Sequence, residues 1–189
     1  MGEGANLHEA KAQARAHCAA AREGVGPRQR AAAAVRLYAM LRELRGRTIA
    51  GYLPIGSEVS PLQCMRVLAR DNTICVPVVT AKGAPLRFRQ WWPGCPTETG
   101  TFGVPVPTEG GWRVPQILIV PLLGFDAGCN RLGYGGGFYD RTLPGLGDAP
   151  AFGLAVEAQR MVQVPREATD VRLTGVMTEA GLYRQGAVE

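Results

Sequence analysis

The chain is poor in the side chains on which many hydrolases and metalloenzymes depend. Its 189 residues include two histidines, His8 and His17, and two serines, Ser57 and Ser60. Neither serine lies in a G-x-S-x-G turn, so the sequence argues against hydrolysis by a serine, histidine and aspartate triad. Two histidines near the N-terminus also argue against a catalytic metal ion held by histidine.

Cysteine is present, but without the spacing of a disulfide framework or a zinc site. Five cysteines are scattered along the chain, none of them in a C-x-x-C pair: Cys18, Cys64, Cys75, Cys95 and Cys129. An odd, dispersed set is typical of free thiols in a reducing compartment. No apolar run is long enough to span a bilayer, and the N-terminal residues lack the apolar core of a signal peptide. We therefore expect a cytoplasmic protein without a membrane partner.

The two common nucleotide-binding fingerprints are also missing. No G-x-x-x-x-G-K-[ST] segment occurs, since no lysine follows the glycines. The dinucleotide pattern G-x-G-x-x-G, counted from Gly133, fails because Phe138 stands where its last glycine would be.

The segment 128–141, GCNRLGYGGGFYDR, nevertheless has the composition of a phosphate-binding loop. Glycines let backbone N–H groups converge on an anion without side-chain obstruction. Arg131 before them can pair with phosphate oxygens, and Asp140 after them can hold Mg²⁺. The apolar run 117–123 leads into this loop, as in open α/β sheets that bind nucleotides. A tight turn without a ligand is the alternative explanation for the glycines.

The net charge of +5 is confined to the N-terminal part of the chain. The first 47 residues hold nine Lys and Arg against four Asp and Glu, whereas the rest holds twelve of each. Lys11, Arg15 and Arg22 recur at helical spacing, so one face of an alanine-rich helix carries a basic stripe. A solvated helix face and a nucleic-acid-binding surface are both compatible with this stripe, although no aromatic residues alternate with it.

Hydrophobic periodicity predicts a single domain over residues 1–189, with loose termini at 1–8 and 185–189. The expected helices are 9–22, 29–45, 61–70 and 136–143. The expected strands are 48–53, 73–79 (weakened or shortened by Pro77), 85–90, 116–122, 151–156 and 175–178. The segment 91–115 reads as a long irregular excursion. The alternation indicates an α/β fold with a mostly parallel sheet covered on both faces.

Four motifs occur in a characteristic order. They are K-x-x-x-R at 11–15, Y-x-P followed by Glu-Val at 52–59, VPLLGFDAGCNRLGYGGGFYDR at 120–141, and P-x-E-x-x-D at 165–170. With these motifs the chain resembles the 5-formyltetrahydrofolate cyclo-ligase family, also called methenyltetrahydrofolate synthetases. The resemblance extends from Lys11 to about Thr178 and includes the family pattern V-P-x-x-x-F-D followed by R-L-G-x-G-x-G-[FY]-Y-D.

This resemblance implies an irreversible, ATP- and Mg²⁺-dependent cyclisation of 5-formyltetrahydrofolate. The formyl oxygen takes the γ-phosphate, N10 attacks the activated carbon, and phosphate leaves to give 5,10-methenyltetrahydrofolate. Such phosphoryl transfer depends on positioning and charge neutralisation. The resemblance also implies a three-layer α/β sandwich, with the folate and ATP as partners and no nucleic acid. We expect a monomer in preference to an oligomer.

The resemblance further implies roles for the residues that match family positions. The residues implied to bind ATP are Lys11, Arg15, Arg131, Leu132, Gly133, Tyr134, Gly135, Gly136, Gly137, Phe138 and Tyr139. Those implied to bind the folate are Leu53, Glu58, Tyr134, Gly135, Gly136, Gly137 and Phe138. Those implied to be catalytic are Arg131, Tyr139 and Asp140, and the Mg²⁺ ligands are Asp140 and Asp170. The alternatives to metal binding are structural: Asp140 could be an acid at the N-terminus of a helix, and Asp170 could cap a loop. Trp91 and Trp92 are candidates to stack on the pterin, although one of them is equally compatible with a place in the core.

The chain departs from the family pattern at three positions. Cys129 stands where glycine is usual, with Gly128 one position earlier, so we expect the entry to the loop to bend differently. Val106 stands where a G-[IV]-x-E-P element has its glutamate, and Thr169 stands where a histidine is frequent. The missing glutamate bears on contacts with the substrate, whereas no phosphate or metal ligand is lost.

Two other functions remain compatible with the sequence. One is a paralogue that binds folate or nucleotide without turnover, and the other is an RNA-binding protein that uses the N-terminal basic helix. Retention of Lys11, Arg15, Arg131 and Asp140 favours turnover. RNA binding predicts an affinity that falls steeply with added salt, together with no folate binding.

Overall fold

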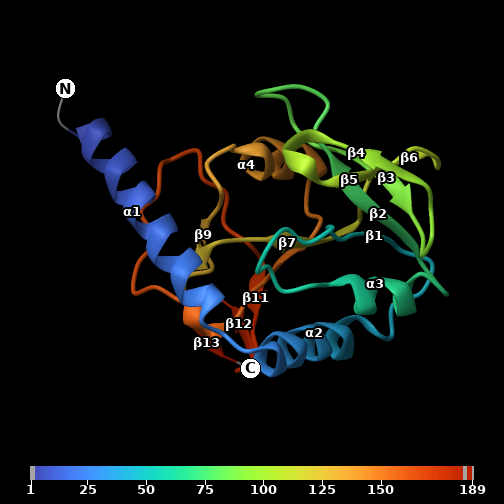
Figure 1. Cartoon of the computed structure of the whole chain (residues 1–189), viewed down its shortest axis with the longest axis horizontal. Coiled ribbons are helices and arrows are strands. Elements are labelled where there is room, and N and C mark those ends of the chain that lie inside the picture. The colour runs from blue at the N-terminus through green and yellow to red at the C-terminus, as the bar shows by residue number, and fades with distance from the viewer. Residues whose placement is uncertain (1–2, 185–186, 189) are drawn as a thin grey trace.

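The computed structural model describes residues 3–184 and 187–188 (Figure 1). The helices are α1 (Glu3–Glu23), α2 (Pro27–Leu41), α3 (Leu62–Leu68) and α4 (Phe138–Thr142), with 3₁₀ turns η1 (Thr101–Gly103), η2 (Leu143–Leu146) and η3 (Glu157–Gln159). The strands are β1 (Thr48–Ala50), β2 (Thr73–Val78), β3 (Arg87–Trp91), β4 (Thr97–Thr99), β5 (Pro105–Pro107), β6 (Trp112–Arg113), β7 (Ile117–Pro121), β8 (Gly124–Phe125), β9 (Arg131–Leu132), β10 (Ala151–Leu154), β11 (Gly175–Met177), β12 (Leu182–Arg184) and β13 (Ala187–Val188).

One sheet organises the described part of the chain. Its nine strands have the order β13-β12-β11-β10-β7-β1-β2-β3-β6. The inner strands β11, β10, β7, β1 and β2 are parallel to their neighbours in this set. Antiparallel strands continue the sheet beyond β11 and beyond β2. The predicted α/β fold with a mostly parallel sheet is confirmed.

Alternation of side chains along the inner strands places a core on each face of the sheet. Ile49 of β1 and Ile119 of β7 pack in a cluster with Leu37 of α2 and Met65 of α3. The next residue of β1, Ala50, belongs to a second cluster, which also contains residues of α4 and η2. Successive strand residues point to opposite faces, so one strand serves both clusters. Helices α2 and α3, the sheet, and α4 with η2 are the three layers (Figure 1).

Helix α1 lies at one end of the sheet rather than over a face of it (Figure 1). It packs against β8, β9 and η3. Its small residues Ala14 and Cys18 meet Leu123, Leu132 and Val164 in a third apolar cluster. This packing fixes the rotation of α1 about its axis, and therefore the direction in which its basic stripe points.

The expected element boundaries needed correction at the N-terminus and in the second strand. Helix α1 begins at Glu3, so residues 3–8 are helical rather than loose; residues 1–2, 185–186 and 189 lie outside the described residues. The strand that Pro77 was expected to weaken or shorten continues to Val78. Strand β1 ends at Ala50, which pairs with Cys75, so the missing N–H of Pro77 lies beyond that parallel neighbour.

The expectation of an irregular excursion over 91–115 is wrong. Strands β4 and β5 form a hairpin with η1 at its tip, and β6 pairs with β3 at the edge of the main sheet. The β8–β9 hairpin and strand β12 were also not anticipated. The strands that were missed, β4, β5, β6, β8, β9 and β12, are two or three residues long, too short to show a period-two pattern in the sequence.

The structure agrees with the absence of an apolar span in the sequence. Among the described helices, none combines the length and apolarity needed to cross a membrane. The five cysteines are buried. Burial raises the pKa of Cys64 and of Cys75 to about 12, so these two thiols stay protonated and unreactive near neutral pH.

Candidate active site

A cavity of about 1200 Å³ opens at the carboxyl ends of the parallel strands. Tyr52 and Leu53 follow β1, Val79 follows β2, and Pro121 ends β7, and all four line the cavity. Open α/β sheets bind ligands at this edge because loops from several strands converge there. The remaining walls come from α1, the glycine-rich loop, α4, the β4–β5 hairpin and the segment 167–170.

The structure brings to this one cavity every residue to which the family resemblance assigned a role in binding ATP, folate or Mg²⁺ or in catalysis. The lining includes Lys11, Arg15, Leu53, Glu58, Arg131, Leu132, Gly133, Tyr134, Gly135, Gly136, Gly137, Phe138, Tyr139, Asp140 and Asp170. These residues come from parts of the chain up to 159 positions apart. Their convergence gives the cavity a charged region and a mainly apolar region, which are described in turn.

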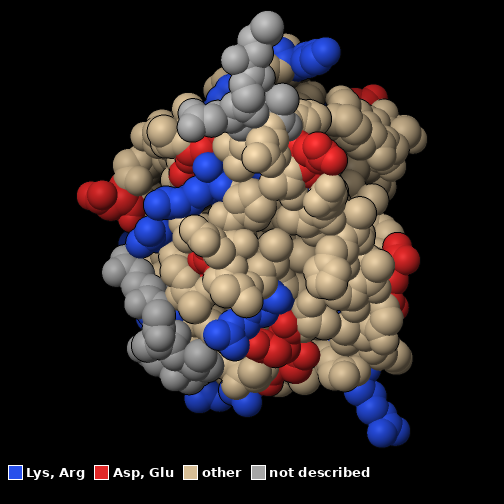
Figure 2. All heavy atoms as spheres, turned by 90° about the vertical axis from the view of Figure 1, so that its left-hand side faces the viewer, with Lys and Arg blue, Asp and Glu red and all other residues tan. Residues whose placement is uncertain are grey.

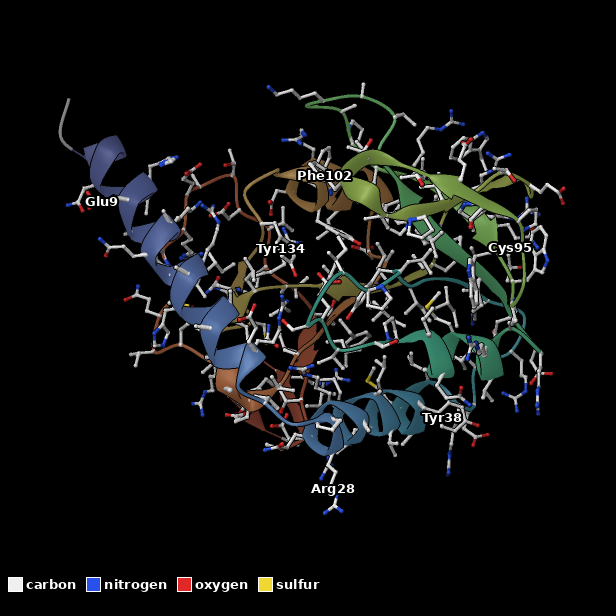
Figure 3. All side chains as sticks on the ribbon, in the orientation of Figure 1. Glu9, Arg28, Tyr38, Cys95, Phe102 and Tyr134 are labelled. Atoms are coloured by element: carbon white, nitrogen blue, oxygen red, sulfur yellow. The ribbon has the colours of Figure 1, made fainter. Side chains whose placement is uncertain are left out.

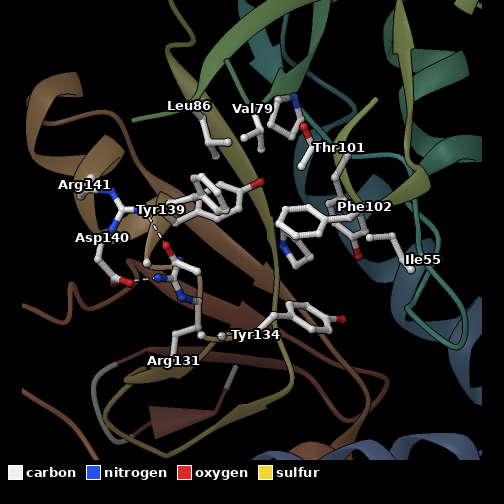
Figure 4. Close-up of a pocket in the computed structure, with 18 of the residues that line it drawn as sticks. Ile55, Val79, Leu86, Thr101, Phe102, Arg131, Tyr134, Tyr139, Asp140 and Arg141 are labelled. Atoms are coloured by element: carbon white, nitrogen blue, oxygen red, sulfur yellow. Dashed lines mark hydrogen bonds and ion pairs between the residues drawn. The ribbon is translucent and has the colours of Figure 1, made fainter. Parts of the chain in front are cut away.

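Arg131 is the buried cation of the charged region (Figure 4). Its side chain is 4% exposed, and its Nη2 atom donates to Oδ1 of Asp140 at 2.7 Å. Its Nε and Nη1 atoms are buried and have no hydrogen-bond partner among the described residues. A buried guanidinium with two unused donors is suited to an anion that offers several oxygen atoms, such as a phosphate group.

Two further cations of the charged region project from the same face of α1. Lys11 Nζ lies 2.7 Å from Asp170 Oδ2 and 3.2 Å from Glu167 Oε1. Burial lowers the pKa of Lys11, but the hydrogen bonds and charges of the two carboxylates outweigh it, so the pKa is raised and the amine stays charged. Arg15 donates through Nε to the carbonyl oxygen of Gly133 at 3.0 Å. The basic stripe therefore turns toward the cavity.

The glycine-rich loop needs glycine at two positions for its backbone conformation, and at one of them also for space. Gly135 and Gly137 have φ angles of +95° and +62°, in the left-handed region that favours glycine. A Cβ atom on Gly137 would lie 2.7 Å from Nη1 of Arg141, whereas one on Gly135 would lie 3.4 Å from the guanidinium carbon of Arg15. A side chain at either position would strain the backbone, and one at Gly137 would also displace the Arg141 side chain.

Asp140 and Asp170 lie together on this side of the cavity, each held by a cation. Asp140 Oδ1 accepts from Arg131 and, at 3.1 Å, from the backbone N–H of Val171. Asp170 Oδ2 accepts from Lys11 and from the N–H of Glu167. In the described part of the chain, no three His, Cys, Asp or Glu side chains form a metal-binding group. Mg²⁺ does not need one, since it is commonly held by one or two carboxylates with water and phosphate.

The mainly apolar region surrounds one carboxylate. Glu58 accepts through Oε2 from the N–H of Ile55 at 2.7 Å and through Oε1 from the hydroxyl of Tyr134. Burial raises the pKa of Glu58, opposed by these two hydrogen bonds and by the charge of Arg22. Tyr134, Ile55 and Phe102 lie on the opposite side of the cavity from Asp140 in Figure 4. A flat ligand with hydrogen-bond donors along one edge suits this region.

Several contributions to the site were not predicted from the sequence. Arg22 had been placed in the basic stripe, yet its donation to Tyr134 was not foreseen. His8 also lines the cavity, and its spacing of three from Lys11 on a helix could have indicated this. Phe102 lines it from the hairpin tip, where it has a φ angle of +62° and is 71% exposed. Gly100 and Gly103, on either side of that tip, were the signal in the sequence that could have predicted a turn here.

The two tryptophans considered for pterin stacking belong to the core. Trp91 is buried in the cluster beneath α2 and α3, and Trp92 packs against the same cluster. Neither is among the described residues that line the cavity. Pairing of β3 with β2, in which Trp91 lies opposite Ile74, carries these rings away from the ligand-binding edge.

The three departures from the family pattern have visible consequences. Cys129 adopts a φ angle of +59°, so it takes the left-handed bend without being glycine. Asp126 supports this bend by accepting through Oδ1 from the N–H groups of Gly128 and Asn130. Val106 and Thr169 both line the cavity. At these positions the cavity therefore has an aliphatic side chain in place of the pattern's glutamate and a hydroxyl in place of its frequent histidine.

The charges around α1 do not form a broad basic surface. Lys and Arg atoms lie beside Asp and Glu atoms on the face that includes the α1 side of the molecule (Figure 2). Two members of the basic stripe line the cavity and the third is buried. The helix therefore turns these three cations inward, and Lys11 and Arg15 are accessible to a small anionic ligand in the cavity.

Comparison with known proteins is consistent with this arrangement. The chain matches the 5-formyltetrahydrofolate cyclo-ligase family over residues 7–179. It is 30% identical over 146 residues to the 5-formyltetrahydrofolate cyclo-ligase of Mycolicibacterium smegmatis, covering 72% of this chain and 75% of that protein. It is 31% identical over 147 residues to that of Haemophilus influenzae, covering 73% and 79%.

The overall structure is also similar to solved structures. The NMR structure of Aquifex aeolicus 5,10-methenyltetrahydrofolate synthetase superposes with a TM-score of 0.77 at 24% identity, covering 95% of this chain and 94% of that one. The Mycoplasma pneumoniae 5,10-methenyltetrahydrofolate synthetase gives 0.70 at 21% identity, covering 89% and 98%. These two similarities bear on the fold, while the family match and the curated relatives bear on descent. On that combined ground, this protein belongs to the 5-formyltetrahydrofolate cyclo-ligase family.

Proposed function

We propose that this protein converts 5-formyltetrahydrofolate to 5,10-methenyltetrahydrofolate with consumption of ATP in the presence of Mg²⁺. The observation that carries the proposal is the buried Arg131 guanidinium, whose Nε and Nη1 atoms have no partner among the described residues. It lies beside a glycine-rich loop, in the same cavity as the carboxylate of Glu58. The proposed site for phosphate and the proposed site for a ring with N–H donors would therefore share one cavity.

The charged region supplies the groups that phosphoryl transfer needs. Arg131, Lys11 and Arg15 would neutralise the triphosphate while the backbone N–H groups of the loop bind its oxygens. Asp140 and Asp170 would hold Mg²⁺, which supplies further neutralisation of the phosphate oxygens. The acids that now pair with Arg131 and Lys11 would then face the metal, leaving both cations available to the phosphate.

The mainly apolar region would bind and orient the folate. Glu58 would accept from the pterin amino and N–H groups, while Leu53, Tyr134 and Phe138 pack on the ring. The formyl oxygen then attacks the γ-phosphorus and releases ADP. N10 attacks the activated formyl carbon and gives up its proton, the C–O bond to the phosphate breaks, and inorganic phosphate leaves with the electron pair and takes up that proton. Because both reactants are held in one cavity, the entropy lost in bringing them together is lost on binding and does not add to the barrier of the chemical step.

The direct test is the near-ultraviolet absorbance of the methenyl product. Purified protein with 5-formyltetrahydrofolate, ATP and Mg²⁺ is expected to form product, and omission of either ATP or Mg²⁺ is expected to stop it. Ligand binding by calorimetry without any product would contradict turnover and indicate a non-catalytic paralogue. In that case Val106→Glu is the first variant to make, since it restores the glutamate that the family pattern has at this position.

Replacing Arg15 with alanine is expected to raise the KM for ATP about tenfold, because a charge-assisted hydrogen bond contributes roughly 1.5–3 kcal/mol. The KM for the folate should change little. Steady-state kinetics with each substrate varied in turn measures both. Arg28→Ala is the matched control, since it removes the same charge from an exposed side chain that points away from the protein (Figure 3). An unchanged ATP dependence in Arg15→Ala would mean that Arg15 does not contact the nucleotide.

A further inference from the structure

Arg22, near the end of α1, is a buried cation behind the wall of the cavity. It is 6% exposed, donates through Nε to Ser57 Oγ at 3.0 Å, and donates through Nη1 to the hydroxyl of Tyr134 at 2.8 Å. Its own carbonyl oxygen accepts from Arg30 Nη2 at 2.9 Å. Among the described residues, no carboxylate forms an ion pair with it. Its side-chain hydrogen bonds go to hydroxyl groups alone, and its Cζ lies 5.9 Å from the centre of the Tyr134 ring. Burying a charge with such partners and no ion pair is costly, so its presence calls for an explanation.

The hydrogen bonds around Arg22 have a single possible direction. A guanidinium has donors and no acceptor, so the oxygen of Tyr134 must accept from Arg22. The hydroxyl proton of Tyr134 is then directed to Glu58 Oε1. The other oxygen, Oε2, accepts the N–H of Ile55. Glu58 is therefore held from two sides as a hydrogen-bond acceptor.

We propose that Arg22 is a positioning residue for folate recognition, which orients the carboxylate of Glu58 through the hydroxyl of Tyr134. The hydrogen bonds from Arg22 to Tyr134 and from Tyr134 to Glu58 are called the relay. The inference rests on the proposed function, because it gives the relay a role in binding the edge of the pterin. Arg22 reaches the loop of Glu58 twice, through Tyr134 and through the adjacent Ser57. Tyr134 occupies an unspecified position of the R-L-G-x-G-x-G pattern, so this relay is not contained in the family signature.

The charge of Arg22 also acts on the ionisation of Glu58. Burial raises the pKa of Glu58, while the bonds from Tyr134 and Ile55 and the charge of Arg22 lower it. The other titratable groups that interact with Glu58 are Tyr52, Tyr134 and Tyr139, and burial raises the pKa of each. These phenols are neutral where a carboxyl titrates. Loss of Arg22 therefore raises the pKa of Glu58, so its acceptor form disappears at a higher pH than in the wild type.

The test is a cycle of Arg22→Met, Tyr134→Phe and the double variant, with ligand affinities measured by calorimetry. Each single variant is expected to bind 5-formyltetrahydrofolate about tenfold more weakly, which corresponds to about 1.4 kcal/mol. The double variant should bind no more weakly than the worse single variant, because both changes break one relay. The acid limb of folate binding should move to higher pH in all three. ATP affinity should stay at the wild-type value in Arg22→Met, since Arg22 is not among the described residues that line the cavity.

Two controls separate positioning from general damage to the fold. Arg22→Lys keeps the charge and one donor and should recover part of the folate affinity, whereas Arg28→Met should change neither affinity. Equal weakening of ATP and folate binding in Arg22→Met would overturn the proposal, since it would reveal a structural role. Additive losses in the double variant, or an unmoved acid limb, would overturn it as well.

A measurement without folate separates this inference from the proposed function. Carboxyl carbon NMR of glutamate-labelled, unliganded protein, with the Glu58 signal assigned through Glu58→Gln, reports the pKa of Glu58 directly. A higher pKa in Arg22→Met than in the wild type is expected, and an unchanged pKa would refute the relay. If the relay is present but the wild type does not bind 5-formyltetrahydrofolate, then the proposed function fails, and with it the assignment of the relay to folate.

Discussion

Replacing Arg131 with methionine is expected to lower kcat/KM about a thousandfold while leaving 5-formyltetrahydrofolate bound. Its Nε and Nη1 donors are buried and have no partner among the described residues, so they are already oriented for an anion. Loss of one such preorganised donor lowers catalysis by roughly 10²–10³-fold, and loss of an arginine at a transferring phosphoryl group by roughly 10³–10⁵-fold. Product formation with ATP varied, together with calorimetry of folate binding, measures the two effects.

Because Arg131 is buried against Asp140, its loss leaves a carboxylate without its ion-pair partner. Arg131→Lys is the appropriate control, since it keeps the charge for Asp140 but lacks the planar array of donors. We expect this variant to fold and to regain little of the lost activity. Wild-type kinetics in Arg131→Lys would show that the guanidinium is not required. Parallel loss of folate binding in Arg131→Met would indicate that Arg131 supports the whole cavity instead.

Replacing Asp140 with alanine is expected to abolish Mg·ATP-dependent turnover and to spare folate binding. Asp140 would contribute to the metal site with Asp170, and it also orients Arg131 through a 2.7 Å ion pair. Asp140 lies on the opposite side of the cavity from Tyr134, whose hydroxyl donates to Glu58 (Figure 4). Loss of Asp140 should therefore leave the carboxylate of Glu58 in place for the folate. Turnover and folate binding should therefore respond differently, by the product assay and by calorimetry respectively.

A titration with Mg²⁺ distinguishes the two roles of Asp140. Asp140→Asn keeps an acceptor for the N–H of Val171 but removes the negative charge. If Asp140 holds the metal, the Mg²⁺ concentration for half-maximal activity should rise at least about tenfold, as expected when a carboxylate ligand is lost. An unchanged Mg²⁺ dependence with a lower kcat would assign Asp140 to the positioning of Arg131 alone. Equal loss of folate and nucleotide binding would contradict both roles.

Local spacing was enough to predict the parts of the site whose residues are close together in the chain. Lys11 and Arg15 are four residues apart, and the helical repeat puts them on one face whatever the tertiary context. The run from Arg131 to Asp140 contains its own cation, its glycines and its acid, so the phosphate-binding composition was visible in sequence. Apolar runs separated by helical patterns likewise predicted a mostly parallel sheet.

Pairing between distant segments could not be predicted in the same way. Residues 91–115 form a hairpin and an edge strand because β4 pairs with β5 and β6 pairs with β3, while their own composition suggests a loop. Trp91 is a core residue because β3 pairs with β2 in a register that places it against the cluster of α2 and α3, and the partly buried Trp92 packs against the same cluster. A register is set by both strands, and either sequence alone leaves it open.

The sequence by itself determined the fold class, the family and those cavity-lining residues that match the family motifs. Only the tertiary structure decided their partners: Lys11 with Asp170 across 159 positions, Arg22 with Tyr134 across 112, and Tyr134 with Glu58 across 76. These bonds join the ends of different strands and helices, and their distances depend on how the sheet and α1 pack. Local periodicity carries no information about such distances, because it describes each element relative to its own axis.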